Sequence, residues 1–479
     1  MRCNHSLVRR TPLERQTAAP RVLAMALLAV VAVPAMANDQ QGAASNASNA
    51  TTTQSAQPGG VQVALPRDYA GQLPGGAAWG AQVPARWNGV LLLFSRGYSP
   101  RAGQPDVAPP ALRQALLDAG YALAASNYGA QGWALEQAVP AQRAVVGAFT
   151  AHFGRPTRTI AWGQSMGGLV TAALVEDAAP VVDGGLALCS SIGGGVGMMN
   201  MALDGAFAFR TLAAPDAGIE LTSIADDRAN SARAQAAVDG AMGSAPGRAR
   251  LLLAGVLAGL PGWTRPDHPN PAPMDDAGQA AEMAATFVMG VLLPRQDQEA
   301  RAGGVFSWNQ GVDYRAQLVA SGRYALVAAA YARAGLSLDA DLARLAAAPR
   351  VQAQRAAVEY MLAHYTPNAR PNVPLLAVQA VGDGMTSPSL QRAYGDGYAA
   401  NVGARAANGP HARFRSLWTN SAGHCGTSVA AALAAIGHIN QRLATGRWGD
   451  VPAPLITHQP PPMLRPCRRG ARRSARNCA

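Results

Sequence analysis

The sequence predicts an α/β protein whose mostly parallel central sheet is interrupted by an all-helical segment. Short apolar runs alternate with helical patterns over residues 61–192, the alternation stops over 193–370, and it returns over 371–447. Strands that alternate with helices form βαβ units, in which the strands are parallel. We therefore expect one sheet domain that carries a helical insertion.

Hydrophobic periodicity places the individual elements. Apolar runs predict strands at 61–65, 79–83, 90–94, 121–126, 160–162 and 185–189, and helical patterns cover 111–118 and 136–152. Alanine-rich helical stretches, broken at prolines and glycines, follow after residue 193. Strands resume at 373–380 and 414–419, with helices at 389–401 and 428–442.

The most informative stretch is the Gly-x-Ser-x-Gly turn around Ser165. It joins an apolar strand pattern to a small-residue helical segment that runs to Glu176. A serine on such a tight turn has a strained backbone, so Gly163 and Gly167 must lack side chains to let the chain pass. The unpaired N–H groups of the helix then lie beneath any oxyanion formed there. The pattern favours a nucleophile elbow over an ordinary glycine-rich βα loop.

A serine hydroxyl needs a base to accept its proton and an acid to orient that base. Among eight histidines, His424 alone lies just after a strand, in the loop SAGHCG. Asp383 occupies the first turn after the 373–381 run, whereas its rival Asp396 falls at the end of the next helix. We predict Ser165 as the nucleophile, His424 as the base and Asp383 as the orienting acid. The alternatives are a solvated or core histidine and a turn-capping aspartate.

The chain order of serine, aspartate and histidine is that of the α/β-hydrolase fold. The phrases GYALAASNYGAQGWALEQA, TIAWGQSMGGLV, GGGVGMMN, SWNQGVDY and AGHC are similar to those of secreted bacterial α/β-hydrolases with a helical insertion. Members of that group are described as esterases, lipases or prolyl-oligopeptidase-like hydrolases. The resemblance covers most of residues 61–445 and implies the α/β-hydrolase fold for the sheet segments.

The resemblance also implies an oxyanion hole made of two backbone N–H groups. One comes from Met166, the residue after the nucleophile, and the other from Gly97 or Tyr98 in the loop after the third strand. Many relatives carry His-Gly where this chain has Arg96-Gly97, which leaves the role of Arg96 open.

The N-terminal residues predict export. Arginines precede an apolar run over 22–33, and small residues at Ala35 and Ala37 fit a signal-peptidase site before Asn38. The run is short for a bilayer span, so a membrane anchor is the lesser alternative and we expect no stable membrane insertion. The mature protein is then periplasmic or extracellular.

Removal of Cys3 with the signal leaves four cysteines in an oxidising compartment, which allows three pairings. We favour Cys189 with Cys425 and Cys467 with Cys478. Cys425 beside the histidine resembles the tannase and feruloyl-esterase group, in which a cysteine beside the serine is its partner. Gln164 stands beside the serine here, so a bridge from Cys189 would have to pin the histidine loop instead.

The formal net charge of +12 resides mainly at the chain ends: residues 1–37 carry +4, the last sixteen residues carry +6, and +2 remains for 38–463. No basic stripe with interleaved aromatics is present, so we expect no nucleic-acid partner. The sequence has neither an HExxH motif nor a CxxC pair, and the predicted chemistry requires no metal and no cofactor.

Together these observations predict a secreted serine hydrolase that cleaves carboxylic esters of small or lipid-like molecules through an acyl-enzyme intermediate. The alternatives are a prolyl-oligopeptidase-like serine peptidase and a non-catalytic binding protein on the same fold. The sequence gives no indication of the oligomeric state. Aromatic residues of the insertion either line an acyl pocket or form the insertion's own core; they are Phe207, Phe209, Trp263, Phe306, Trp308 and Tyr314.

The expected domain organisation follows from these elements. It consists of a signal peptide (1–37), a flexible linker (38–60), the first part of the α/β-hydrolase core (61–192), a helical cap insertion (193–370), the second part of the core (371–447) and a disordered Pro/Arg-rich tail (448–479).

Overall fold

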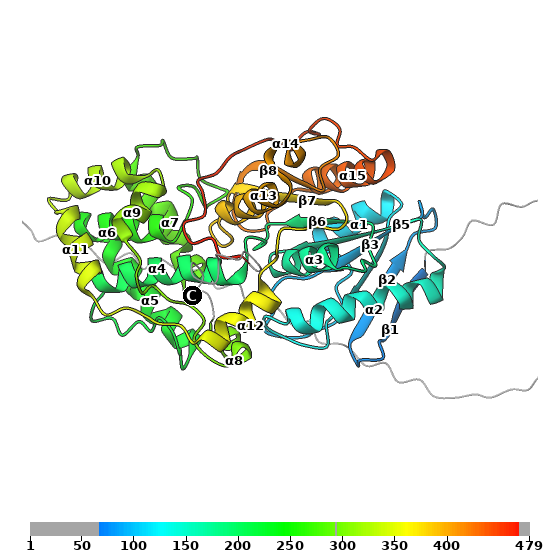
Figure 1. Ribbon diagram of the computed structural model, residues 1–479, viewed down its shortest axis with the longest axis horizontal. Coiled ribbons are helices and arrows are strands. Elements are labelled where there is room, and N and C mark those ends of the chain that lie inside the picture. The colour runs from blue at the N-terminus through cyan, green and yellow to red at the C-terminus, as the bar shows by residue number, and fades with distance from the viewer. Residues whose placement is uncertain (1–66, 293–294, 469–479) are drawn as a thin grey trace, which may run out of the picture. The chain divides into compact units, whose positions relative to one another are not determined.

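The computed structural model of the chain describes residues 67–292 and 295–468 (Figure 1). The expected signal peptide, the linker, the strand at 61–65 and Cys478 lie outside these residues.

The centre of the fold is an eight-stranded sheet. Its strands are β1 (Arg67–Gln72), β2 (Ala78–Val83), β3 (Val90–Ser95), β4 (Ala122–Ser126), β5 (Arg158–Gln164), β6 (Gly184–Leu188), β7 (Leu375–Gly382) and β8 (Phe414–Ala422). They lie in the order β1-β2-β4-β3-β5-β6-β7-β8. β1–β2 and β2–β4 are antiparallel pairs, and all the other neighbours are parallel. This mostly parallel sheet is the expected α/β-hydrolase core.

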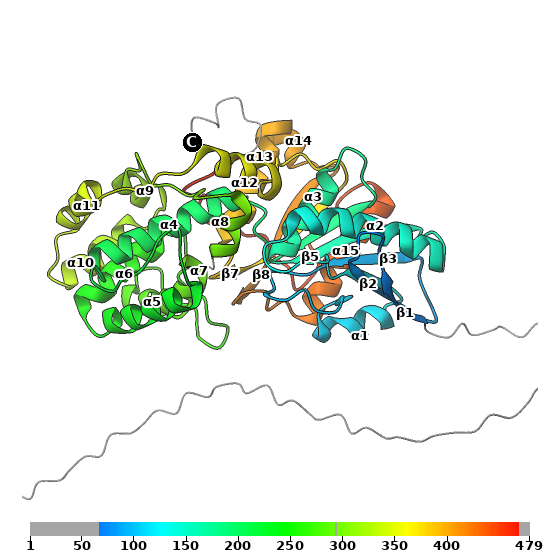
Figure 2. The same cartoon turned by 90° about the horizontal axis from the view of Figure 1, so that it is seen from below.

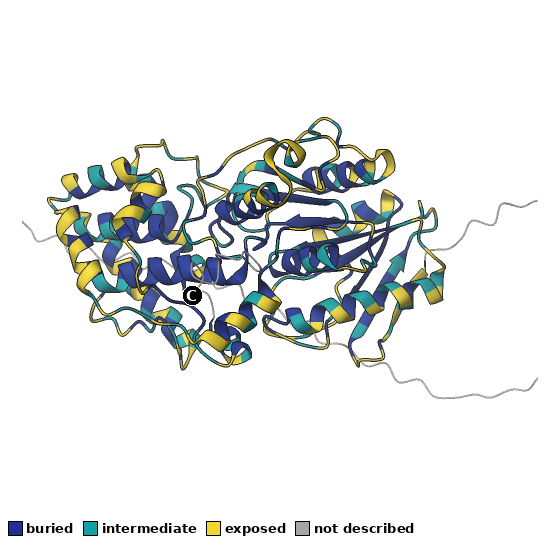
Figure 3. Cartoon of the chain, in the orientation of Figure 1, coloured by how far each residue is buried: buried dark blue, intermediate teal, exposed yellow. Residues whose placement is uncertain are grey.

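Helices cover both faces of the sheet, as parallel strands require. α2 (Leu135–Phe153), α3 (Met166–Glu176) and α13 (Pro388–Val402) lie on one face, and α1 (Pro110–Asp118) and α15 (Val429–Thr445) lie on the other (Figure 2). The short α14 (Ala404–Ala407) follows α13. The central strands β3 to β6 are almost entirely buried, which explains why their sequences are continuous apolar runs rather than alternating ones (Figure 3).

The predicted helical insertion lies between β6 and β7. It comprises α4 (Gly195–Leu212), α5 (Asp227–Met242), α6 (Ala245–Leu257), α7 (Asp276–Val291), α8 (Gln296–Ala302), α9 (Tyr314–Ala320), α10 (Tyr324–Arg333), α11 (Leu338–Ala347) and α12 (Arg355–Tyr365). Its helices bury their own hydrophobic core, separate from that of the sheet. No helix in the described part of the chain combines the length and hydropathy that crossing a membrane needs.

The aromatic residues of the insertion serve mainly its packing. Phe207, Phe209 and Tyr314 belong to the insertion's own core, and Phe306 and Trp308 are buried in the core that contains the sheet. Phe207, Phe209 and Tyr314 therefore fit the alternative of an insertion core, whereas Phe306 and Trp308 pack with the sheet.

Residues 448–468 correct the expectation of a disordered tail. Ile456 forms an antiparallel bridge with Trp418 of the edge strand β8. Leu455 and Met463 are buried. Arg465 reaches Asp204 in the insertion, 2.8 Å between Nη1 and Oδ2. Figure 1 shows this red segment between α13 and the insertion. Its proline-rich composition suggested disorder, but a few well-spaced apolar groups and one buried ion pair are enough to hold it against the fold.

Candidate active site

Ser165 lies between β5 and α3 in the strained conformation expected of a nucleophile elbow. Its φ is 56° and its ψ is −124°, and its backbone N–H donates to the Leu188 carbonyl of β6 over 3.1 Å. A Cβ atom on Gly167 would lie 1.9 Å from the Ser95 oxygen, and one on Gly163 would lie 2.3 Å from the Gly167 oxygen. Both positions therefore accept glycine alone, as the steric argument requires.

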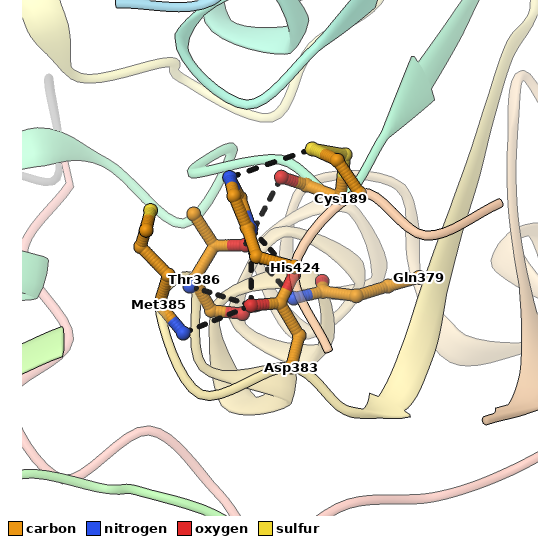
Figure 4. The surroundings of a disulfide bond; sticks show 7 residues. Cys189, Gln379, Asp383, Met385, Thr386 and His424 are labelled. Carbon is orange, nitrogen blue, oxygen red and sulfur yellow. Dashed lines mark hydrogen bonds and ion pairs between the residues drawn. A yellow bond between two sulfur atoms is a disulfide. The ribbon is translucent and has the colours of Figure 1, made fainter. Parts of the chain in front are cut away.

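Asp383 directly follows β7, and its buried carboxylate contacts His424, which lies two residues beyond β8. His424 Nδ1 is 2.9 Å from Oδ2 and 3.1 Å from Oδ1 of Asp383 (Figure 4). The backbone N–H groups of Met385 and Thr386 donate to Oδ1, each over 2.9 Å. The Thr386 hydroxyl lies 2.8 Å from Oδ2. Together with the imidazole Nδ1–H of His424, four donors hold this carboxylate. An Nδ1–H directed at Asp383 leaves Nε2 as the acceptor of the imidazole, 3.4 Å from the disulfide sulfur of Cys425, which has no proton to donate.

Asp396, the alternative candidate for the orienting acid, lies near an arginine of its own helix instead. Asp396 lies one turn from Arg392 on α13, with 3.6 Å between Oδ2 and Nε, and its side chain is more than half exposed. Asp383 is the one of the two that meets the histidine.

A disulfide links Cys189, the residue after β6, to Cys425, the residue after His424. This pairing was predicted and is confirmed; the other predicted pair includes Cys478, which lies outside the described residues. The bridge fastens the histidine loop to the β6 end, one residue from the carbonyl that accepts the Ser165 N–H. Sulfur atoms joined in a disulfide are not thiolates, so the close group of Cys189, His424 and Cys425 is no metal site.

The candidate oxyanion residues lie at two loop ends beside Ser165. A Cβ atom built on Gly97 would be 3.2 Å from the Ser165 Cβ and 3.7 Å from its Oγ, so this glycine is in contact with the serine. Met166 is the first residue of α3, where helix geometry leaves its N–H without an intrahelical acceptor. Tyr98 is 38% exposed, and its ring centroid lies 5.8 Å from that of Trp133.

Arg96 braces the loop that contains Gly97. Its Nη2 donates to the carbonyls of Ala130 over 2.7 Å and Asn127 over 3.3 Å, and its Nη1 donates to the Gly97 carbonyl over 3.1 Å. The guanidinium lies 4.6 Å from the Tyr128 ring centroid. Burial lowers the pKa of Arg96, with the Tyr128 hydroxyl acting weakly in the opposite sense. Arg96 therefore ties the loop after β3 to the loop after β4.

Two further residues that support the site were not predicted from the sequence. The Thr386 hydroxyl lies within hydrogen-bond distance of both Asp383 and the Cys189 carbonyl, the latter at 3.0 Å. The buried Gln142 side chain of α2 donates to Phe94 O and Ser95 Oγ and accepts from Ser126. The spacing of an aspartate and a threonine three residues apart in DGMT is a local capping signal that could have identified Thr386. Gln142 carries no comparable local signal.

Comparison with known proteins gives one extended sequence relative. No protein-family model matches the chain. The o-phthalyl amidase of Xanthobacter agilis is 28% identical over 413 residues, which cover 79% of this chain and 87% of that protein.

Two solved structures are more distant. Feruloyl esterase B from Aspergillus oryzae has 14% identity and a TM-score of 0.38, covering 79% of this chain and 80% of its own. The acylaminoacyl peptidase of Pyrococcus horikoshii has 9% identity and a TM-score of 0.36, covering 81% and 43%. Likenesses this weak carry no argument about activity.

The chain itself supplies the decisive features. Its sheet is mostly parallel, a strained serine follows β5, a buried aspartate follows β7, and a histidine bonded to that aspartate follows β8. Strand-to-helix serine turns and this chain order distinguish one superfamily from the other folds that carry the same catalytic groups. The chain has the α/β-hydrolase fold.

Proposed function

We propose that the protein is a serine hydrolase that cleaves carboxylic esters through Ser165, His424 and Asp383. One observation carries the proposal: a buried carboxylate orients His424 on a loop that a disulfide fastens beside the strained serine turn. Such an arrangement has little purpose in a protein that only packs or binds, because strained backbone is costly unless it serves a site.

The proposed mechanism follows from the protonation of the imidazole. With Nδ1–H held by Asp383, Nε2 accepts the Ser165 proton while Oγ attacks the acyl carbon. The negative charge that develops on the carbonyl oxygen is met by the N–H of Met166 and by that of Gly97 or Tyr98. His424 then protonates the departing alkoxide, and a water molecule repeats the sequence to release the acid. Asp383 stays ionised throughout and stabilises the imidazolium.

Cleavage of an amide is the second candidate, and the similarity to o-phthalyl amidase favours it. The same groups serve both bonds, since protonation by His424 also converts an amine into a leaving group. Ester and amide cleavage differ in how well His424 delivers a proton to the alkoxide or amine leaving group and in how the site binds that group.

The test compares wild type with Ser165→Ala on p-nitrophenyl esters from acetate to palmitate and on matched p-nitroanilides, with a proline arylamide beside them. Loss of the nucleophile should lower kcat at least about 10³-fold on every true substrate. Ser337→Ala is the control, because it removes a serine hydroxyl that caps α11 within the insertion. Anilide turnover without ester turnover would establish the amidase candidate, and equal rates in wild type and Ser165→Ala would refute the serine mechanism.

We also propose that residues 1–37 direct export and that the mature chain begins at Asn38. The disulfide between Cys189 and Cys425 supports an oxidising compartment. N-terminal sequencing of the protein recovered from the periplasm or the medium tests this, and an intact Met1 there would contradict it.

A further inference from the structure

A cavity of about 540 Å³ lies where the insertion, the start of α13 and the C-terminal segment meet. Its size is in the range of small-molecule sites. Leu260 from the insertion, Pro388 from α13 and Leu464 from the C-terminal segment give it apolar walls. Ser165, Asp383 and His424 are not among the residues that line it, so the inference below does not depend on the proposed hydrolysis.

The polar lining of the cavity is cationic. Arg323 and Arg392 contribute the positive charge, and no aspartate or glutamate lines the cavity among the residues that the structure describes. His458 also lines it, but burial lowers the pKa of its imidazole, so this side chain is neutral at neutral pH. The nearest carboxylate to Arg392 is Asp396, at 3.6 Å from Nε on a largely exposed side chain, and such pairs are weak. The cavity thus carries positive charge that its own walls do not neutralise.

Arg323 is the central cation. Its Nη1 donates to the Leu260 carbonyl over 2.7 Å and its Nη2 donates to Gln279 Oε1, both neutral acceptors. Burial lowers the pKa of Arg323 to about 10, so the guanidinium is still charged at neutral pH. Gly262 makes room for it, because a Cβ there would lie 2.6 Å from Nη2. A partly buried cation with neutral partners is stabilised when an anion joins it.

Two hydroxyl groups at the start of α13 also line the cavity. Ser389 lies in the first turn of this helix and also lines the cavity, with its hydroxyl 2.8 Å from that of Ser387. Ser387 Oγ donates to the Gly259 carbonyl over 2.6 Å, so the Ser389 hydroxyl donates its one proton to Ser387.

We propose that this cavity binds a small monocarboxylate with an aromatic or short aliphatic body. The carboxylate meets the guanidinium of Arg323, whose planar donors match two carboxylate oxygens. The apolar body lies against Leu260, Pro388 and Leu464. A bare inorganic anion would leave those walls unfilled, and a neutral analogue would leave the cation uncompensated.

Calorimetric titration of the full-length wild-type protein tests the ligand class. Benzoate and hexanoate should bind, whereas benzamide, hexanamide and acetate should bind at least about tenfold more weakly, the loss expected for one charge-assisted hydrogen bond or an unfilled apolar wall. Equal binding of acid and amide, or of hexanoate and acetate, would overturn the proposal, and so would the absence of binding by both acids.

Variants locate the binding. Arg323→Gln removes the cation, and Ala320→Trp fills the cavity from an exposed position at the end of α9, where a larger side chain leaves the core intact. Both should weaken benzoate binding at least about tenfold. Arg355→Gln is the matched control, since its guanidinium is 89% exposed and pairs with Glu359. Wild-type affinity in Ala320→Trp would place the ligand elsewhere, even if Arg323→Gln failed to fold.

Discussion

His424 Nδ1 lies 2.9 Å from Oδ2 of Asp383, a carboxylate with no exposed surface that four hydrogen-bond donors hold in place. The imidazole therefore has one orientation relative to the strand ends. Every other part of the proposed mechanism depends on that orientation.

Replacing this carboxylate by an amide should preserve the fold and remove the activity. In Asp383→Asn the side chain keeps its size, but an amide N–H directed at the imidazole favours the wrong tautomer. We expect kcat to fall by about 10⁴-fold while KM changes little. Steady-state kinetics with the best ester substrate measures this.

Asp396→Asn is the control for that substitution, because Asp396 was the alternative acid and lies on the surface of α13. It should have wild-type kcat. A loss of activity in Asp396→Asn with none in Asp383→Asn would reverse the assignment.

Thr386 should act as a positioning residue. Its hydroxyl lies 2.8 Å from Asp383 Oδ2 and 3.0 Å from the Cys189 carbonyl. Thr386→Val loses a hydrogen bond to a charged group, so we expect kcat to fall about tenfold or more at nearly unchanged KM. Thr386→Ser keeps the hydroxyl and should recover most of the rate, and a Ser variant as slow as the Val variant would indicate a packing role instead.

The disulfide should stabilise the fold and hold the histidine loop. Cys189 and Cys425 are separated by 236 residues, and both have a left-handed backbone, with φ of 42° and 57°. The double variant Cys189→Ala/Cys425→Ala should lose about 2–5 kcal/mol of unfolding free energy. Its kcat should also fall, since His424 adjoins the lost bridge.

Reductant provides the control for the disulfide. Wild type and the double variant, both treated with dithiothreitol, should have similar melting temperatures and kcat, because the reductant removes from wild type the bridge that the double variant lacks. Unchanged activity and melting temperature in the double variant would show that the other contacts of the histidine loop suffice.

Asp204 should make stability depend on pH. It is fully buried, it pairs with Arg465 and it accepts from the Tyr314 hydroxyl over 3.0 Å. Burial raises the pKa of its carboxyl to about 6, although Arg465 opposes this. Because the folded value exceeds the unfolded one, the native state binds the proton more tightly. The contribution of Asp204 to stability is therefore full below about pH 4 and is lost as the pH rises to about 6.

Urea unfolding of wild type and Asp204→Asn across this range measures the effect. The unfolding free energy of wild type should fall relative to that of the variant by about 2 kcal/mol between pH 4 and pH 6. Asp339→Asn, at a largely exposed carboxyl, should follow wild type. Parallel curves for wild type and Asp204→Asn would show that the carboxyl titrates at its ordinary pKa.

Local patterns were sufficient to predict strands β2 to β8 and the chemistry-bearing turns, whereas β1 at Arg67–Gln72 was not predicted. The run at 90–94 became β3 and the elbow formed at Ser165, because apolar periodicity and glycine spacing act over a few residues. Asp383 and His424 could be chosen because each follows a strand, and parallel strands bring their carboxyl ends to one edge.

Contacts between distant segments could not be predicted in the same way. No local pattern indicated that Arg96 would donate hydrogen bonds to the loop at 127–130. None indicated that Arg465 would form an ion pair with Asp204. The proline-rich composition after residue 448 suggested disorder, yet its few apolar groups find partners on the sheet and the insertion.

The sequence by itself determined the fold class, the order of the elements, the strained serine turn and the identity of the candidate acid and base, since each is encoded within a short stretch of chain. Only the tertiary structure decided that the carboxylate meets the imidazole, that Thr386 and Arg96 brace the site, and that a cationic cavity forms beside α13. Those features depend on side chains separated by tens to hundreds of residues, and their free energies arise only once the sheet and the insertion have packed.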